Sequence, residues 1–503
     1  MVPIEKEVAA PSHGIVVETT TGSIRGALIN GVNIFRSIPY AAPPLGKQRF
    51  APPQPVSPWT GTRESTRIGP SAPQPASRLD AVMGVAPFEQ SEDCLTVSVW
   101  SPSLRGKRLP VLVWFHGGAY ITGGGDLPFY DAENLARRGD IVVVTVNSRL
   151  GAIGYLYLQQ SQNDAYANRG LLDQEYALLW VKRNIDLFGG DPDNITAAGQ
   201  SAGGGAVMAL LTRSSSRALI QRAIVQSPAI ATQSVVIAET ISRRFFAAAG
   251  INYGDADRLS DLPLAALLSA QKQVASEISA SGNLEPPFQL VTGTTTLPFP
   301  PAKFIASGGV SEMPFIIGTT RDEVHAWLAQ DDNMVSLSPM KMFVRLIRTH
   351  GVVPALAYCV LSLWHLRLPP WRVVSKLGTY VAFKRPVIEL ANGHSKNGGA
   401  VHVYRFDWQP TVEAKFGACH CIELPFLFGN LDQWRNSPML GGLSVLSFQR
   451  ISKSMQDTWI EFVRGNKLNA YKVSWPTYNQ RHRAVLIISE DVHVSEKWAK
   501  QGH

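Results

Sequence analysis

The sequence predicts an α/β protein in which a large central, mostly parallel sheet is flanked by helices. Two observations support this. Short runs rich in Val and Ile alternate with longer segments of helical period, which is typical of buried strands joined by helices. Hydrophobic residues also make up 45% of the 503 residues and charged residues only 17%, which suits a large core. Because neither an internal repeat nor a linker is visible, residues 1–503 are expected to form one domain.

The predicted strands cover residues 111–115, 141–146, 194–198, 223–226, 315–317 and 402–406. Helical period predicts helices over 174–187 and 202–211, and the second is so rich in Gly and Ala that it can lie close to the sheet. Proline clusters at 39–58, 70–75 and 286–301 are expected to be loops, since apolar patterning resumes on both sides of each.

The net charge of +8 is unevenly distributed. From Met340 to Ile388 there are eight Lys and Arg residues and no Asp or Glu, and an apolar stretch at 352–368 lies among them. This arrangement indicates a lid or a surface element more readily than a basic stripe for nucleic acid. No nucleic-acid partner is therefore expected.

Cysteine usage and the N-terminal sequence favour a cytoplasmic protein. Four cysteines are too few for a disulfide scaffold and suit a reducing compartment; they are Cys94, Cys359, Cys419 and Cys421. The first residues show no basic segment leading into an apolar one, and no run reaches 18 uninterrupted apolar residues. Neither a signal peptide nor a membrane-spanning helix is predicted.

The strongest local motif is a G-x-S-x-G sequence centred on Ser201. It follows the predicted strand 194–198 and precedes the small-residue helix, as a nucleophilic serine on a tight strand-turn-helix elbow requires. Gly199 and Gly203 lack the bulk that such a turn excludes. The alternative is a glycine-rich packing turn without chemistry.

A second glycine motif follows the strand at 111–115, in the sequence His116-Gly117-Gly118-Ala119. Acyl transfer develops negative charge on a carbonyl oxygen, and closely approaching backbone N–H groups stabilise it. Gly118, Ala119 and Ala202 are the predicted donors. The alternative is a turn that needs glycine only for its backbone angles.

Several further motifs occur in a fixed order along the chain: FRSIPYA at 35–41, SEDCL at 91–95, NSRLG at 147–151, LDQ at 172–174, FGGDP at 188–192 and WP at 475–476. With the two glycine motifs, they make the chain resemble the type-B carboxylesterase and cholinesterase family of the α/β-hydrolase fold, from Gly22 to about Tyr478. The resemblance implies a serine esterase for small-molecule esters, with a Ser-Glu-His triad, an oxyanion hole of three donors and no cofactor.

Carried over by motif, the resemblance assigns Ser201 as nucleophile, Glu323 as the acid and His420 as the base. Glu323 ends the sequence GTTRDE at 318–323, and His420 lies in GACHCIELPF at 417–426. The chemistry agrees, because a neutral imidazole must take the serine proton and a carboxylate must orient the ring. Asp322 is the competing acid.

Four departures from the family pattern affect the expected chemistry. Val324 follows the acid where glycine is usual, and Cys421 follows the base where Gly or Ala is usual, so both crowd the site. Gln200 replaces the Glu of cholinesterases, which disfavours choline esters. The loop at 69–74 lacks the cysteine that pairs with the equivalent of Cys94 in secreted relatives, so Cys94 is expected to be free.

Other functions find little support. Cys419, His420 and Cys421 are too close in sequence to aim at one metal ion, no phosphate-binding loop is present, and Asn194 opens a sequon inside a predicted strand. The remaining alternatives are a lipase acting at a lipid interface and a non-catalytic interaction protein of the same fold.

An insertion at about 335–390 is expected to form a helical cap over the active site. Its basic and apolar stretch at 340–388 either lines the substrate entrance or contacts an anionic membrane surface. The sequence leaves these alternatives and the oligomeric state open.

Overall fold

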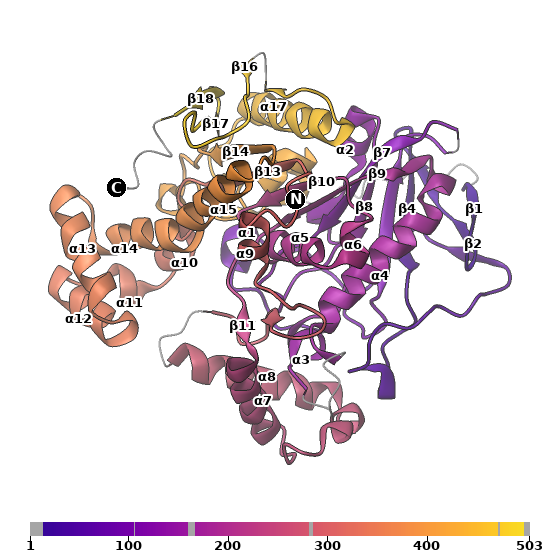
Figure 1. Cartoon of the computed structure of the whole chain (residues 1–503), viewed down its shortest axis with the longest axis horizontal. Coiled ribbons are helices and arrows are strands. Elements are labelled where there is room, and N and C mark those ends of the chain that lie inside the picture. Colours follow the sequence, from indigo (N-terminus) through magenta and orange to yellow (C-terminus); the bar gives the residue numbers. More distant parts are fainter. Residues whose placement is uncertain (1–13, 105, 159–165, 281–284, 471–472, 497–503) are drawn as a thin grey trace, which may run out of the picture.

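The computed structural model describes residues 14–104, 106–158, 166–280, 285–470 and 473–496. Through the described part runs a sheet of eleven strands in the order β18-β17-β14-β13-β10-β9-β7-β8-β6-β4-β3 (Figure 1). The strands are β3 (Ala27–Ile29), β4 (Val32–Pro39), β6 (Thr96–Ser101), β7 (Leu109–Phe115), β8 (Val142–Val146), β9 (Gly190–Gln200), β10 (Arg222–Gln226), β13 (Phe315–Thr320), β14 (Val401–Phe406), β17 (Val485–Ile488) and β18 (His493–Ser495).

The strands from β8 to β17 run parallel to one another, and antiparallel strands complete both edges. The prediction of an α/β fold with a mostly parallel sheet is confirmed. All six predicted strands belong to this sheet, as β7, β8, β9, β10, β13 and β14. The largest difference is β9, which begins four residues before the predicted strand.

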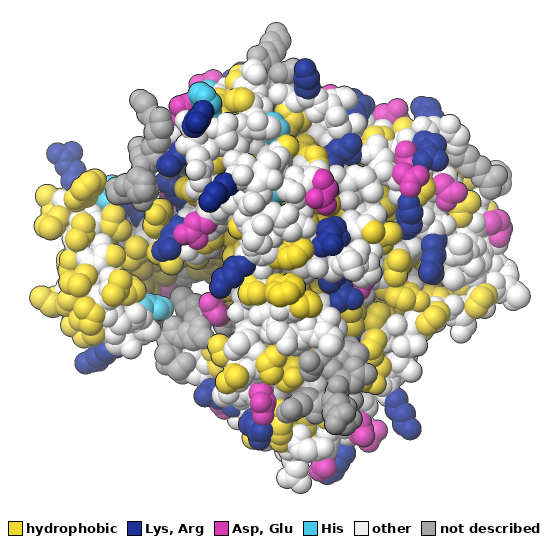
Figure 2. Space-filling model, viewed as in Figure 1, with side chains coloured by type: hydrophobic (Ala, Val, Ile, Leu, Met, Phe, Trp, Pro, Cys, Tyr) yellow, Lys and Arg dark blue, Asp and Glu magenta, His cyan; other side chains and the backbone are white. Residues whose placement is uncertain are grey.

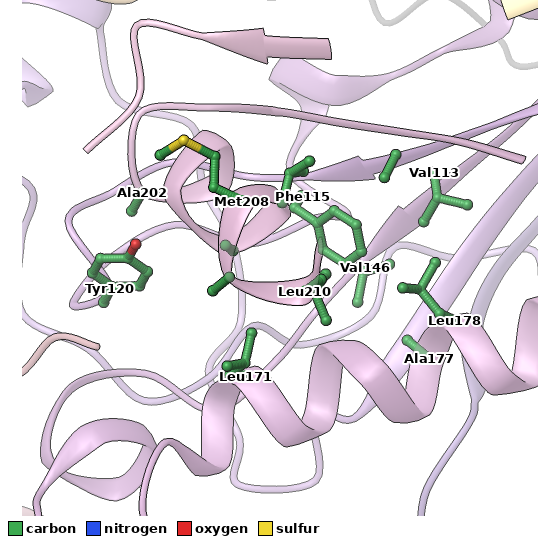
Figure 3. Packing of buried hydrophobic residues seen from close by; sticks show 14 of the residues in the cluster. Val113, Phe115, Tyr120, Val146, Leu171, Ala177, Leu178, Ala202, Met208 and Leu210 are labelled. Carbon is green, nitrogen blue, oxygen red and sulfur yellow. The ribbon is translucent and has the colours of Figure 1, made fainter. Parts of the chain in front are cut away.

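Successive side chains of each central strand point to opposite faces of the sheet. On one face Val111, Val113 and Phe115 pack against α4 (Arg169–Asn184) and α5 (Ala202–Thr212), as Figure 3 shows for part of this core. On the other face Leu112 and Trp114 pack against α2 (Glu133–Gly139), α16 (Leu424–Phe428) and α17 (Val445–Arg464). Because both faces are covered, the central strands are apolar throughout.

The predicted helices are confirmed, with the first divided between α4 and the 3₁₀ turn η4 (Ile185–Phe188) and the second matching α5. Further helices and strands complete the body: α1 (Asp80–Met83), α3 (Gly151–Tyr155), α6 (Ser214–Arg217), α7 (Val235–Ala248), α8 (Leu264–Ala280), α9 (Pro301–Ala306), β1 (Val16–Thr19), β2 (Gly22–Arg25), β5 (Thr62–Glu64), β11 (Gln233–Ser234), β12 (Val291–Thr292), β15 (Asn469–Ala470) and β16 (Val473–Ser474).

Between β13 and β14 the chain forms a series of helices: α10 (His325–Ala329), α11 (Asp332–Val335), α12 (Pro339–His350), α13 (Val352–Trp364), α14 (Pro370–Thr379), the π-helical turn η6 (Tyr380–Lys384) and α15 (Arg385–Lys396). In Figure 1, α11, α12 and α13 project from the body at the left, and α14 leads back to it. Across the described ranges, no helix combines the length and apolar character needed to cross a bilayer.

Candidate active site

The predicted site residues follow four strands of the parallel part of the sheet. Ser201 comes directly after β9, the loop of Gly118 and Ala119 follows β7, and Glu323 and His420 follow β13 and β14. In an open α/β sheet, the carboxyl ends of the strands are where ligands bind. The structure therefore brings residues that are far apart in sequence together at the carboxyl ends of the parallel strands.

Ser201 lies on a strained turn between β9 and α5, with φ of 57° and ψ of −123°. Main-chain hydrogen bonds hold this conformation: its N–H donates to the carbonyl of Gln226 at 2.9 Å, and its carbonyl accepts from Gly205 and Ala229. A Cβ on Gly203 would overlap the carbonyl oxygen of Phe115. Only glycine fits there, as the elbow prediction required, and the side chain of Ser201 stays half-buried at the start of α5.

Glu323 and His420 form a buried pair. The carboxylate Oε2 of Glu323 lies 2.6 Å from Nδ1 of His420, and Oε1 accepts the backbone N–H of Thr320 at 2.9 Å. Both side chains are almost fully buried. This contact orients the imidazole and leaves Nε2 as the nitrogen that can act as the base, which is the arrangement that general-base chemistry needs.

Asp322, the competing acid, binds backbone and not His420. Its Oδ2 accepts the N–H of Ala418 at 3.1 Å, and its own N–H donates to the carbonyl of Ala418. Burial raises the pKa of Asp322, but Arg321 and His325 more than offset it, so the pKa is lowered. Asp322 thus joins the two loops that carry Glu323 and His420.

The far nitrogen of His420 meets Gln200. The amide nitrogen of Gln200 donates to Nε2 at 3.1 Å, and Sγ of Cys421 donates to Oε1 of Gln200 at 3.6 Å. Burial lowers the pKa of His420, whereas the neighbouring Cys421 and the carboxylate of Glu323 raise it, and the net pKa lies well above the ordinary value. Two of the departures from the family pattern therefore affect His420. Gln200 contacts the imidazole directly, and Cys421 contacts it through the amide of Gln200.

Two aromatic rings that sequence reasoning missed pack on His420. The ring centroids of Trp327 and Phe383 lie 5.1 and 5.3 Å from that of the imidazole. Trp327 lies on α10, one turn after Glu323, and Phe383 comes from η6 at the end of the helical series. Trp327 could have been predicted as a site residue, because it lies one helical turn after Glu323. Nothing in the sequence around Phe383 indicates that it contacts His420.

The loop after β7 lies against the elbow, because a Cβ on Gly117 would come within 3.1 Å of Cβ of Ser201. Gly118 and Ala119 both have positive φ, of 116° and 56°. Within the part of the chain that the structure describes, their N–H groups have no protein acceptor, and Ala202 opens α5, where helical N–H groups are unpaired. The three predicted donors thus carry amides that are available to a ligand.

Glu423 is a buried carboxyl group that the sequence interpretation passed over, although it stands in the quoted motif around His420. Its Oε1 accepts from Nε2 of Gln226 at 3.4 Å, and no partner among the described residues meets Oε2. Burial, with nearby Glu323, raises the pKa of Glu423 to about 7.

All four cysteines are free, and Cys94 is buried. Across the described ranges, no group of three or more His, Cys, Asp or Glu residues could hold a metal ion.

The comparisons with known proteins identify the family of this chain. The carboxylesterase family model matches residues 13–353 and 370–502. The para-nitrobenzyl esterase of Bacillus subtilis is 38% identical over 95% of each chain, and the phenmedipham hydrolase of Pseudarthrobacter oxydans is 34% identical over 97% of this chain and 98% of its own.

Solved structures give the same result. A para-nitrobenzyl esterase structure superposes with a TM-score of 0.84 at 36% identity, covering 97% of this chain and 99% of its own. A carboxylesterase of Geobacillus stearothermophilus has a TM-score of 0.85 at 35% identity over 97% of this chain and 100% of its own. The chain belongs to the carboxylesterase family and has the α/β-hydrolase fold. It is a carboxylic ester hydrolase, as the resemblance implied.

Proposed function

We propose that this enzyme cleaves esters through an acyl-enzyme on Ser201, with His420 as general base and acid and Glu323 as the group that orients it. The observation that carries the proposal is the buried 2.6 Å contact between Glu323 and His420 at the sheet edge where Ser201 sits. A carboxylate there stabilises the imidazolium that forms when His420 takes the serine proton.

Acylation begins when the hydroxyl oxygen of Ser201 attacks the ester carbonyl while its proton passes to Nε2 of His420. The Gln200 amide that meets Nε2 in the free enzyme must yield this nitrogen to Ser201, in keeping with catalytic hydrogen bonds that tighten only in the substrate complex. The amides of Gly118, Ala119 and Ala202 stabilise the oxyanion.

The tetrahedral intermediate collapses when His420 returns the proton to the alcohol oxygen, so that the alcohol leaves. Water then attacks the acyl-enzyme with His420 again as base, and the acid product is released. No cofactor takes part in these steps.

The proposed substrates are neutral small-molecule esters with short to medium acyl groups. Gln200 supports this choice, because an uncharged amide stands where a carboxylate would attract a quaternary ammonium group. Trp327 and Phe383 add apolar surface beside His420. The name of one relative, para-nitrobenzyl esterase, makes para-nitrobenzyl esters reasonable first substrates.

A rate profile over para-nitrophenyl esters from two to sixteen carbons tests this proposal, with the Ser201→Ala protein as the blank. Highest kcat/KM for acyl chains of about two to eight carbons is the expected result. A maximum at sixteen carbons, with activation by emulsified substrate, would instead favour the alternative of a lipase that acts at a lipid interface. The exposed apolar side chains of α13 are the observation that supports the lipase alternative.

We further propose that the enzyme works in the cytoplasm, which the four free cysteines support. The same fold can serve non-catalytic interaction proteins, but the Glu323–His420 pair and the elbow at Ser201 favour the enzyme. We also propose that the helices within 335–390 act as a cap. The contact of Phe383 with His420 supports a cap that forms part of the site wall.

A further inference from the structure

The helical pair formed by α12 and α13, here called the hairpin (339–364), leaves large apolar side chains in solvent. On α13 and just beyond it, seven such side chains are exposed, and Leu363, Trp364 and Leu366 keep 70%, 80% and 82% of their surface. The other four are Val352, Val353, Leu356 and Val360. Those on the helix recur at intervals of three and four residues, so they form one face.

The opposite side of the hairpin is packed against the protein. Ala355 and Tyr358 of α13 and Met342 and Leu346 of α12 are buried in the same core cluster as Trp371 of α14. α13 is therefore apolar on both its inner and its outer face. A helix that is apolar all round normally lies in a core or against lipid, and here half of it meets solvent.

Basic residues flank the exposed apolar face. Lys341, Arg345 and Arg348 are exposed on α12, where they alternate with Met340, Val344 and Ile347, and Arg367 follows Leu366. These four basic side chains form no ion pair within the described part of the chain. Figure 2 shows hydrophobic side chains gathered over this lobe, with Lys and Arg at its margins.

Most of the exposed face lies outside the part of the chain that the family model matches. The family model matches up to residue 353 and resumes at 370, so the five exposed positions from Leu356 to Leu366 lie in the unmatched segment. Ester hydrolysis at the sheet does not explain why this segment carries exposed Leu, Val and Trp side chains.

The distribution of charge decides which partner fits this face. The hairpin and the turn after it carry four basic residues, Lys341, Arg345, Arg348 and Arg367, and no acidic one, so two hairpins of identical charge would repel each other across a symmetric contact. An anionic bilayer supplies both missing partners, since acyl chains accept the apolar face and lipid headgroups attract the Lys and Arg residues. α13 has 13 residues and is about 20 Å long, too short to span the roughly 30 Å apolar layer, so it would lie in the interface.

We propose that the hairpin docks this enzyme on anionic phospholipid membranes, with the α13 face inserted at the headgroup level. The docking surface connects directly to the site: α14 continues from the hairpin to Thr379, whose hydroxyl accepts the N–H of Val324 at 3.3 Å, next to Glu323. If the proposed function holds, docking gives the enzyme esters that are dissolved in the membrane.

Vesicle co-sedimentation tests this proposal with vesicles of phosphatidylcholine alone or mixed with phosphatidylserine. The Ser201→Ala protein is measured beside the wild type, so that docking is read without hydrolysis and its failure is distinct from a failure of the proposed function. We expect both proteins to bind the mixed vesicles, to bind less as salt rises, and to bind neutral vesicles weakly. Absence of binding to mixed vesicles at low salt would overturn the proposal.

Two sets of substitutions locate the surface. Changing Lys341, Arg345, Arg348 and Arg367 to Gln should lower binding about fivefold per charge, and so by roughly several hundredfold. Changing Leu363, Trp364 and Leu366 to Ser should abolish binding with all charges in place. A matched control changes four exposed basic residues elsewhere to Gln, namely Arg244, Lys272, Arg450 and Lys467.

Turnover of a soluble short-chain ester shows that each variant is folded, since none of these residues belongs to the site. Equal loss of binding in the control would show that total charge and not the hairpin matters, which would overturn the proposal. So would a dimer in light scattering that the Leu363, Trp364 and Leu366 substitutions dissociate, because the face would then bind a second copy.

Discussion

The elbow at Ser201 and the hairpin of α12 and α13 differ in side-chain size and in exposure. The elbow is built from small, tightly packed residues, whereas the hairpin carries large apolar residues that are exposed. At the elbow, Gly199 and Gly203 bring backbone against backbone, and an added methyl group has no space. On the hairpin and just beyond it, Trp364 and Leu366 keep 80% and 82% of their surface exposed. The chemistry therefore depends on a tightly packed frame, whereas the exposed face of the hairpin is free of that constraint.

The largest effect should come from Ser201→Ala. Because triad members act as a unit, kcat is expected to fall about a millionfold, measured with para-nitrophenyl butyrate at saturating concentration. An organophosphate should label Ser201 in the wild type, as read by mass spectrometry of peptides. Labelling of the same extent in the Ser201→Ala protein would contradict the assignment.

The acid comes next. Glu323→Gln leaves the shape but removes the charge 2.6 Å from Nδ1 of His420, so kcat should fall by about 10⁴. Asp322→Asn is the matched control, because asparagine keeps an oxygen for the N–H of Ala418, and its loss should stay within about tenfold. A larger loss in the Asp322 variant than in the Glu323 variant would assign the acid to Asp322.

A third prediction addresses the frame itself. Gly203→Ala places a methyl group on the carbonyl oxygen of Phe115 and should destabilise the enzyme by about 1–3 kcal/mol or more. Leu363→Ala on the hairpin should change the free energy of unfolding by no more than about 0.5 kcal/mol, since the side chain is mostly exposed. Thermal unfolding of the two variants compares them, and equal losses would remove the distinction between the regions.

Sequence reasoning succeeded where function imposes a local pattern. The elbow could be predicted because a tight strand-turn-helix leaves room only for small residues at 199 and 203, and the motifs then placed Glu323 and His420. Strand positions followed from continuous apolar runs, since strands buried on both faces need them. The start of β9 was placed too late, because residues 190–194 have the polar sequence GDPDN and pair with β7 only at Gly190, before a shift in register.

Contacts made by tertiary structure alone could not be predicted. Phe383 reaches His420 from more than thirty residues before it in sequence, and Gln200 meets the imidazole across the edge of the sheet. The segment 340–388 showed its charge and apolar content in the sequence. Which of its side chains are exposed depends on how α12, α13 and α14 pack, and that is set by the fold.

Gln200 allows a smaller prediction about specificity. Gln200→Glu adds a carboxylate beside the site, so kcat/KM for butyrylcholine relative to para-nitrophenyl butyrate should rise about tenfold. The ratio of the two kcat/KM values is compared between the wild type and the variant, so that any general loss of activity cancels. An unchanged or lower ratio would show that Gln200 has no part in excluding choline esters.

The smallest effect should be a shift of the pH profile in Cys421→Ala. The pKa of His420 is raised, and Cys421 contributes to raising it. Since only neutral His420 can take the serine proton, kcat/KM should increase with pH until the pKa of His420 is passed. Removing the sulfur lowers that pKa, so the acidic limb of the profile should move to lower pH while the plateau changes little.

Cys359→Ala, on α13 and outside the site, is the matched control and should leave the limb in place. A limb that stays unchanged in Cys421→Ala, or moves to higher pH, would show that Cys421 does not raise the pKa of His420.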